Sequence, residues 1–179
     1  MIRPSCAPPF AVSPVEPNAP SLLSPEHLAM MEGGASVIVS SCDAELVPSV
    51  MRAVGSQVSA QGRLVTVYLC RSQSDQLLRD VARSGRLAAV FSQPSSHRTV
   101  QLKTRGARLR EAREDDAPVL QRYLTGMERE LTLIGFGPVY ARAMLAHNLD
   151  DVVAIEFEPD QAFDQTPGPK AGRAIEGGT

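Results

Sequence analysis

Hydrophobic and polar residues alternate in short runs along much of the chain, and this pattern is typical of β-strands with one buried face. The runs cover residues 35–42, 46–59, 63–70, 86–92, 98–111 and 151–159. Short links join the first three, one of them containing Gln61 and Gly62, and consecutive strands linked in this way pair antiparallel. We therefore predict six antiparallel strands and no parallel sheet.

Four other segments repeat their apolar residues at helical spacing. They are 24–34, 72–85, 115–134 and 138–148. Ser24 suits the cap of the first helix, and Asp115 and Asp116 open the third, where the helix dipole favours negative charge. The third helix carries a long apolar stripe. The sequence leaves open whether this stripe packs on its own protomer or on a second copy.

Closing antiparallel strands into a barrel removes the unpaired edges of an open sheet. We therefore predict an α+β fold in which a small six-stranded antiparallel barrel is flanked by helices. This domain covers residues 25–160. A proline-rich arm at 1–24 precedes it and a glycine- and proline-rich tail at 161–179 follows; both compositions disfavour regular structure.

Composition limits the kind of protein. The 179 residues, 43% of them hydrophobic, suffice for one domain with a proper core. A formal net charge of −2 gives no general attraction to nucleic acid or to an anionic membrane, so any anion site must be local. The three cysteines suggest neither a disulfide framework nor a metal site, and no apolar stretch has the length of a signal peptide or membrane helix. We expect a cytoplasmic protein without nucleic-acid or membrane partners.

The stretch FSQPSSHRTVQLK (91–103) concentrates polar side chains directly after a predicted buried strand. Period-two alternation places Thr99, Gln101 and Lys103 on one face and the apolar residues between them on the other. The preceding loop adds four further polar residues: Ser95, Ser96, His97 and Arg98. Two interpretations are open: a site for a phosphorylated planar ligand, or a polar hairpin end that faces water. On residue types alone we favour the second.

Three short motifs shift this balance. They are PSVMRAV (48–54), the pair VTVYLC and GRLAAVF on either side of the second helix, and RTVQLK (98–103). Together they resemble the FMN-binding split-barrel superfamily, to which pyridoxamine 5'-phosphate oxidase belongs. The likeness extends from Val37 to Leu109. A bacterial subgroup of pyridoxamine 5'-phosphate oxidase-like proteins is similar in FSQPSSHRTVQLK and in the closing TPGPKAG as well.

The chain departs from the true oxidases at two points. They carry a glutamate, aromatic, tryptophan signature near the carboxyl end, whereas this chain has no tryptophan and reads IEFEPDQAF there. The family's phosphate-binding lysine at the start of the internal helix is also missing, since Leu77 stands near that position. We therefore do not expect pyridoxamine phosphate oxidation. Arg71, Arg98 or Lys103 would have to replace the lysine.

The resemblance implies a split barrel that binds FMN at the interface of a homodimer, with flavin contacts from the arginine of the second strand. It implies an oxidoreductase of unknown substrate, for which a small molecule or reduced nicotinamide is a possible partner. The candidate cofactor-binding residues are Arg52, Val54, Arg71, Ser95, Ser96, His97, Arg98, Thr99, Gln101 and Lys103. No catalytic residue is assigned and no metal ligands are expected. The alternatives are a non-enzymatic sensor that binds flavin or haem, and a barrel that has lost its cofactor site.

Overall fold

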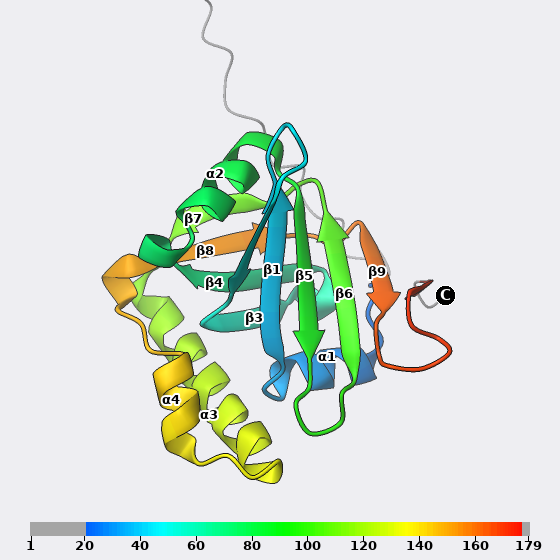
Figure 1. Ribbon diagram of the computed structural model, residues 1–179, viewed down its shortest axis with the longest axis vertical. Helices are drawn as coiled ribbons and strands as arrows, with labels where there is room; N and C mark the ends of the chain where they lie inside the picture. Colours follow the sequence, from blue (N-terminus) through cyan, green and yellow to red (C-terminus); the bar gives the residue numbers. More distant parts are fainter. Residues whose placement is uncertain (1–20, 177–179) are drawn as a thin grey trace, which may run out of the picture.

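The computed structural model describes residues 21–176, which form two antiparallel sheets and four α-helices (Figure 1). Most of the predicted arm lies outside the described residues. The strands are β1 (Ser36–Cys42), β2 (Pro48–Arg52), β3 (Gly55–Ser59), β4 (Leu64–Cys70), β5 (Leu87–Ser92), β6 (Thr99–Thr104), β7 (Arg108–Glu111), β8 (Val152–Phe157), β9 (Gln161–Asp164) and β10 (Arg173–Ala174). The helices are α1 (Pro25–Glu32), α2 (Asp75–Ser84), α3 (Ala117–Leu133) and α4 (Pro138–Met144).

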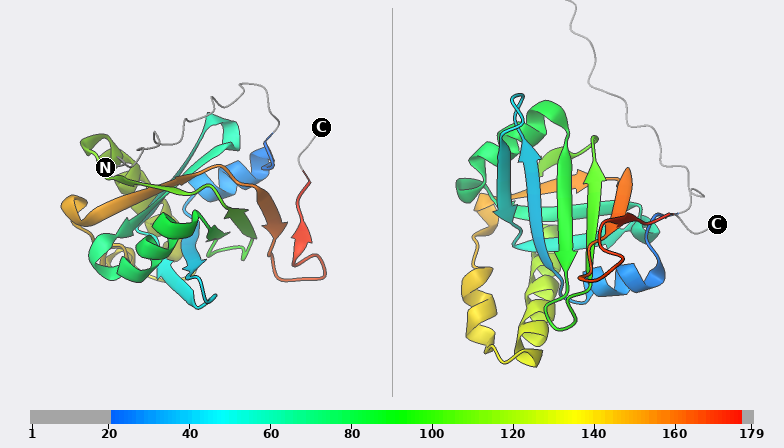
Figure 2. Two further views of the ribbon diagram at one scale, coloured as in Figure 1. Left: turned by 90° about the horizontal axis from the view of Figure 1, so that it is seen from above. Right: turned by 45° about the vertical axis from the view of Figure 1, so that its right-hand side comes forward.

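The larger sheet has the order β10-β9-β6-β5-β1-β2 and the smaller sheet β3-β4-β8-β7. The strands of the smaller sheet run across those of the larger one, so the two sheets enclose a core between them (Figures 1 and 2). Among residues 21–176 neither sheet closes on itself. The predicted antiparallel α+β character is therefore confirmed, but the closed six-stranded barrel is not.

Two of the predicted strands are each divided between the sheets. The backbone N–H of Ala53 donates to Val37 in the larger sheet, whereas that of Val54 donates to Tyr68 in the smaller one. The run 46–59 thus turns a corner and becomes β2 and β3, and the run 98–111 likewise becomes β6 and β7. The tail contributes the short strands β9 and β10, although its composition predicted no regular structure.

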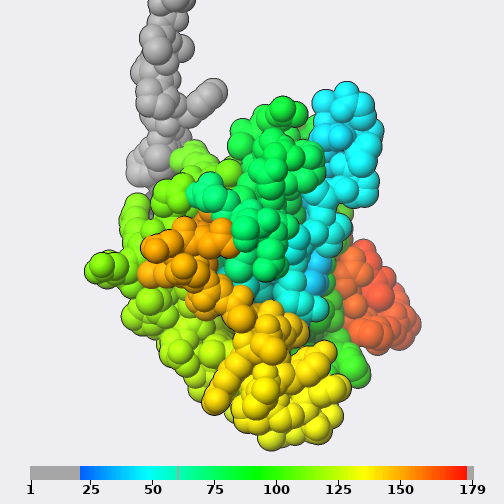
Figure 3. All heavy atoms as spheres, turned by 60° about the vertical axis from the view of Figure 1, so that its left-hand side comes forward, coloured from blue at the N-terminus to red at the C-terminus, as the bar shows by residue number. Residues whose placement is uncertain are grey.

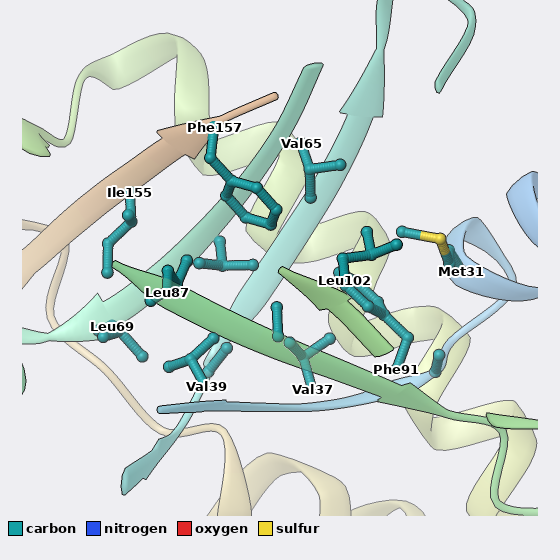
Figure 4. Close-up of a cluster of buried hydrophobic side chains, with 14 of the residues drawn as sticks. Met31, Val37, Val39, Val65, Leu69, Leu87, Phe91, Leu102, Ile155 and Phe157 are labelled. Carbon is teal, nitrogen blue, oxygen red and sulfur yellow. The ribbon is translucent and has the colours of Figure 1, made fainter. Parts of the chain in front are cut away.

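The core lies between the two sheets, and Figure 4 shows its aliphatic and aromatic side chains converging from both. Val37 of β1 and Phe91 of β5 are fully buried, and each apolar side chain of this kind contributes about 1.5–3 kcal/mol to stability. In β8 the predicted alternation is confirmed. Ile155 and Phe157 lie in this core, whereas Ala154 faces a second apolar cluster.

Helix α3 carries the apolar stripe of the third predicted helix, and the structure shows what this stripe packs against. Its residues Val119, Tyr123, Met127 and Leu131 are all buried within the protomer. Ahead of β1, Gly34 has a φ of 112°, and a Cβ atom there would lie 2.4 Å from the backbone of Gly126 in α3. The stripe therefore belongs to the protomer's own core. None of the helices within residues 21–176 is long and apolar enough to cross a membrane.

A buried polar network fastens the start of α3 to the smaller sheet. The carboxylate of Asp116, 6% exposed, accepts hydrogen bonds from the Tyr68 hydroxyl at 2.8 Å and from the two terminal nitrogens of Arg110 at 2.6 and 2.9 Å. It also accepts from the backbone N–H of Arg113 at 2.8 Å, and Arg110 Nε donates to Glu156 at 2.5 Å. Asp116 therefore anchors the helix through specific partners in addition to any interaction with the helix dipole.

Candidate functional site

The surface of the larger sheet that points away from the core is the main candidate site, and we call it the outer face. It comprises Pro48, Val50, Arg52, Ser36, Ile38, Ser40, Ala88, Val90, Ser92, Thr99, Gln101 and Lys103. No helix of the described chain lies over its central strands β1, β5 and β6 (Figure 1). The outer face is therefore open to a ligand or a partner.

One row of paired residues crosses four strands of this face. Ile38 pairs with Arg52 on one side and with Val90 on the other, and Val90 pairs in turn with Gln101. Neighbouring strands lie about 4.8 Å apart, so Arg52 and Gln101 are separated by roughly 14 Å. The row thus consists of an apolar centre between a guanidinium and an amide.

Four of the predicted cofactor-binding residues lie on the outer face: Arg52, Thr99, Gln101 and Lys103. Arg52 donates to the Ser36 hydroxyl at 2.6 Å, and the Lys103 ammonium lies 4.8 Å from the ring centroid of Phe163. The side chain of Gln101 has only a long contact, 3.3 Å, with Gln165. These polar groups are held by neighbours on the same surface rather than turned into the core.

The predicted loop residues lie at one end of this face, and most of them have partners within the chain. The hydroxyl of Ser95 donates to Glu130 at 2.6 Å, and that of Ser96 to the Gln93 amide at 2.7 Å. Arg98 contacts Glu26 at 3.3 Å. His97 is exposed and has a φ of 59°. The loop is thus fastened to the protomer, and a ligand phosphate would have to compete with these contacts.

Glu130 of α3 is the residue that holds the loop, and the sequence analysis did not identify it. It is 3% exposed and accepts from Ser95 and from the Gln93 amide at 3.0 Å. Burial disfavours its ionised form, but these hydrogen bonds outweigh burial and hold the pKa of the carboxyl below its usual value. The signal was present, since Glu130 follows Met127 by three residues and therefore falls on the buried stripe.

Replacing Glu130 by alanine should release the loop at 93–98 and lower the free energy of unfolding by about 1–2 kcal/mol, because Ser95 and Gln93 lose a charged acceptor. Faster amide hydrogen exchange at 93–98 would measure the release. The matched control is Glu128→Ala on the same helix, whose partner Arg142 is well exposed, so little change is expected. Unchanged exchange in the Glu130 variant would show that the loop is held by other contacts.

Two predicted residues lie away from the outer face. Val54 is 7% exposed and packs with Tyr68 and Leu120 in the second apolar cluster. Arg71 follows β4 and forms an exposed ion pair with Glu111 of β7 at 2.5 Å. The side chain of Val54 therefore packs in the core. Arg71 lies away from the outer face and is not placed to contact a ligand bound there on the same protomer.

The other end of the outer face opens into a groove of about 840 Å³. We call it the cationic groove, because Arg86, Lys103 and Arg105 line it together with Asp160. Only Lys103 was predicted. Arg86 and Arg105 lie within the predicted strands 86–92 and 98–111, but in the structure each lies just outside a strand, before β5 and after β6, where strand alternation does not apply.

No protein-family description and no curated protein matches this sequence. Solved structures do match. HupZ of Group A Streptococcus superposes with a TM-score of 0.52 at 10% identity, covering 84% of this chain and all of the other. A candidate pyridoxamine 5'-phosphate oxidase from Lactobacillus delbrueckii gives a TM-score of 0.50 at 14% identity, covering 79% of this chain and 93% of the other. At such identities the likeness concerns the fold.

Proposed function

Since the chain has the fold of pyridoxamine 5'-phosphate oxidase-like split-barrel proteins, we propose that it binds FMN on the outer face and acts as an oxidoreductase on a small molecule. The observation that carries the proposal is the row from Arg52 to Gln101, with its apolar centre and polar ends. A flat tricyclic ring needs an apolar surface beneath it and hydrogen-bonding groups at its edges, and this row supplies both.

The residues present fit such a group. Ile38 and Val90 form an apolar floor, because side chains on adjacent strands of one face lie side by side. The Gln101 amide, whose contact with Gln165 is long, is available to donate to a ring edge. For the phosphate, the cationic groove offers positive charge beside the same face.

In this proposal the flavin ring, when bound, supplies the acceptance and donation of hydride. The protein binds and orients it. Arg52 would hold one edge of the group, because it places positive charge at one end of the row. His97 is one of the candidate cofactor-binding residues, and its exposed position in the loop allows it to contact a ligand phosphate.

We also propose that a second copy of the chain covers the outer face, so that the cofactor lies between protomers. The edge strand β2 and the hairpin before it expose Leu46, Val47 and Val50, by 66%, 59% and 58%. Figure 3 shows this hairpin, in cyan, projecting beyond the green helix α2. Apolar side chains that project in this way are typical of surfaces that bind a partner.

The test is to mix the purified protein with FMN and pass it through a desalting column. A retained flavin spectrum that bleaches with reduced nicotinamide would support an enzyme. A retained flavin without turnover would support the non-enzymatic alternative, and a Soret band after haem addition would support haem. A sample that retains neither flavin nor haem would overturn the proposal.

A further inference from the structure

We propose that the cationic groove is a binding site for a phosphate group, with Arg86, Lys103 and Arg105 as its ligands. Arg86 lies in the motif GRLAAVF, but neither Arg86 nor Arg105 is among the candidate cofactor-binding residues that the sequence predicts. The site is at the opposite end of β6 from the polar loop at 93–98. The site does not depend on the proposed function, because the phosphate can belong to FMN or to a separate ligand.

Three separate segments bring the cations together. Arg86 lies between α2 and β5, Lys103 lies in β6, and Arg105 lies in the turn between β6 and β7. All three line one groove of about 840 Å³, a volume typical of small-molecule sites. Ser40 of β1 lines the same groove and adds a hydroxyl. The arrangement therefore depends on the tertiary fold and not on one run of basic residues.

The backbone that carries these cations is rigidly held. Gly85 has a φ of 65°, and a Cβ atom there would lie 2.4 Å from the Arg105 carbonyl oxygen, so the two arginine-bearing turns are in direct contact. The N–H of Ala107 donates to Gly85 at 3.0 Å, which closes the same contact. The Ser41 hydroxyl donates to the Arg86 carbonyl at 2.8 Å. The backbone positions from which the two arginine side chains extend are therefore fixed by the fold before a ligand binds.

The charges of the groove favour a dianion. Three cations face one carboxylate, that of Asp160, which already accepts the backbone N–H of Arg105 at 2.8 Å. None of the ion pairs found within residues 21–176 uses the side chain of Arg86, Lys103 or Arg105. The local charge of about +2 contrasts with the formal charge of −2 on the whole chain.

A simpler explanation accounts for only part of the cluster. Basic residues near the C-terminus of a helix stabilise its dipole, which would explain Arg86 after α2. It does not explain Lys103 and Arg105, which lie on other elements of the fold. Arginine forks bind phosphate oxygens in bidentate fashion, and two arginines and a lysine beside Asp160 give a net charge of about +2, which matches a phosphate monoester dianion.

Calorimetric titration of the full chain with inorganic pyrophosphate tests the site. We expect saturable binding that weakens as sodium chloride is raised. Arg86→Ala and Arg105→Ala should each raise the Kd by about tenfold or more, since each removes charge-assisted hydrogen bonds. Arg83→Ala is the matched control, because Arg83 lies on the last turn of α2 outside the groove, and its Kd should match the wild type. Thermal melting confirms that the variants remain folded.

Absence of saturable binding, or equal losses in all three variants, would overturn the inference. Repeating the FMN titration with saturating pyrophosphate identifies the source of the phosphate. Competition would mean that the groove holds the phosphate of FMN, and independent binding would mean a second, phosphorylated ligand. If the protein retains flavin but the Arg86 and Arg105 variants bind pyrophosphate like the wild type, the phosphate site is rejected and the proposed function stands. Pyrophosphate binding without flavin retention would reject the proposed function alone.

Discussion

Replacing Asp116 by alanine should lower the free energy of unfolding by about 3–5 kcal/mol, measured by urea or thermal denaturation. The reason is that Asp116 satisfies the buried hydroxyl of Tyr68 and both terminal nitrogens of Arg110 at once. The Arg110 side chain is 20% exposed and would keep only Glu156 as a charged partner. A partly buried guanidinium without its main counter-ion is costly, because desolvation is no longer offset.

The neighbouring residue provides a matched control. Asp115 is exposed, so Asp115→Ala should change stability by no more than about 0.5 kcal/mol. Tyr68→Phe removes one hydrogen bond and should cost about 1 kcal/mol. Equal effects of the Asp115 and Asp116 variants would mean that the helix dipole, rather than the buried network, explains both carboxylates.

The same carboxylate predicts a pH dependence. Hydrogen bonds from Arg110, chiefly, lower the pKa of Asp116 from 3.8 to about 2. Because the folded-state pKa lies below the usual value, the stabilisation is fully present above about pH 4 and is lost as the pH falls towards 2. This shift corresponds to about 2 kcal/mol. Denaturation between pH 5 and 2 should therefore show a smaller loss of stability in Asp116→Ala than in the wild type.

The local elements of the fold could be predicted because their signals are local. The cap at Ser24 and the alternation in β8 depend on a few neighbouring residues, and both occur as predicted. The corners of the sheets depend instead on distant partners. Nothing within 46–59 indicates that Ala53 bonds to one sheet and Val54 to the other. The strand count was therefore wrong, although the antiparallel character was right.

The candidate site was predictable to a similar degree. Alternation correctly placed Thr99, Gln101 and Lys103 on one face, because side chains on a strand point alternately to its two sides. It could not show that Glu130, 35 residues after Ser95, binds the loop. It likewise could not show that Arg86 and Arg105, 19 residues apart, line one groove, because the contact between Gly85 and the Arg105 carbonyl that brings their turns together is tertiary.

The outer face combines features that a folded protomer does not need for itself. The core on the other side of the sheet is complete, and its apolar residues are buried without help from a partner. Ile38 and Val90 nevertheless leave an apolar strip between polar ends on the outward side. A strip of this kind loses its contact with water only when a ligand or a second chain covers it. Because the core does not depend on the outer face, substitutions on that face should change binding without lowering the stability of the fold.

Replacing Val90 by glutamate should therefore weaken FMN binding by about 100-fold or more while leaving the protein folded. The new carboxylate would lie at the centre of the strip, beneath the proposed ring, where binding would remove its water without supplying a cation. A loss of this size corresponds to about 3 kcal/mol. In the free protein the same carboxylate faces solvent, so the melting temperature should change little. Fluorescence titration with FMN gives the affinity.

The matched control is Val139→Glu, the same substitution at a valine of α4 that is 75% exposed and distant in the fold from the outer face. It should bind FMN like the wild type. Size-exclusion chromatography with light scattering separates two reasons for a loss in Val90→Glu. A dimer that no longer binds FMN places the ring over Val90, and a monomer shows that the second copy is needed to hold it. Wild-type affinity in Val90→Glu would exclude the outer face as the flavin site, because no ring could lie on that strip without meeting the charge.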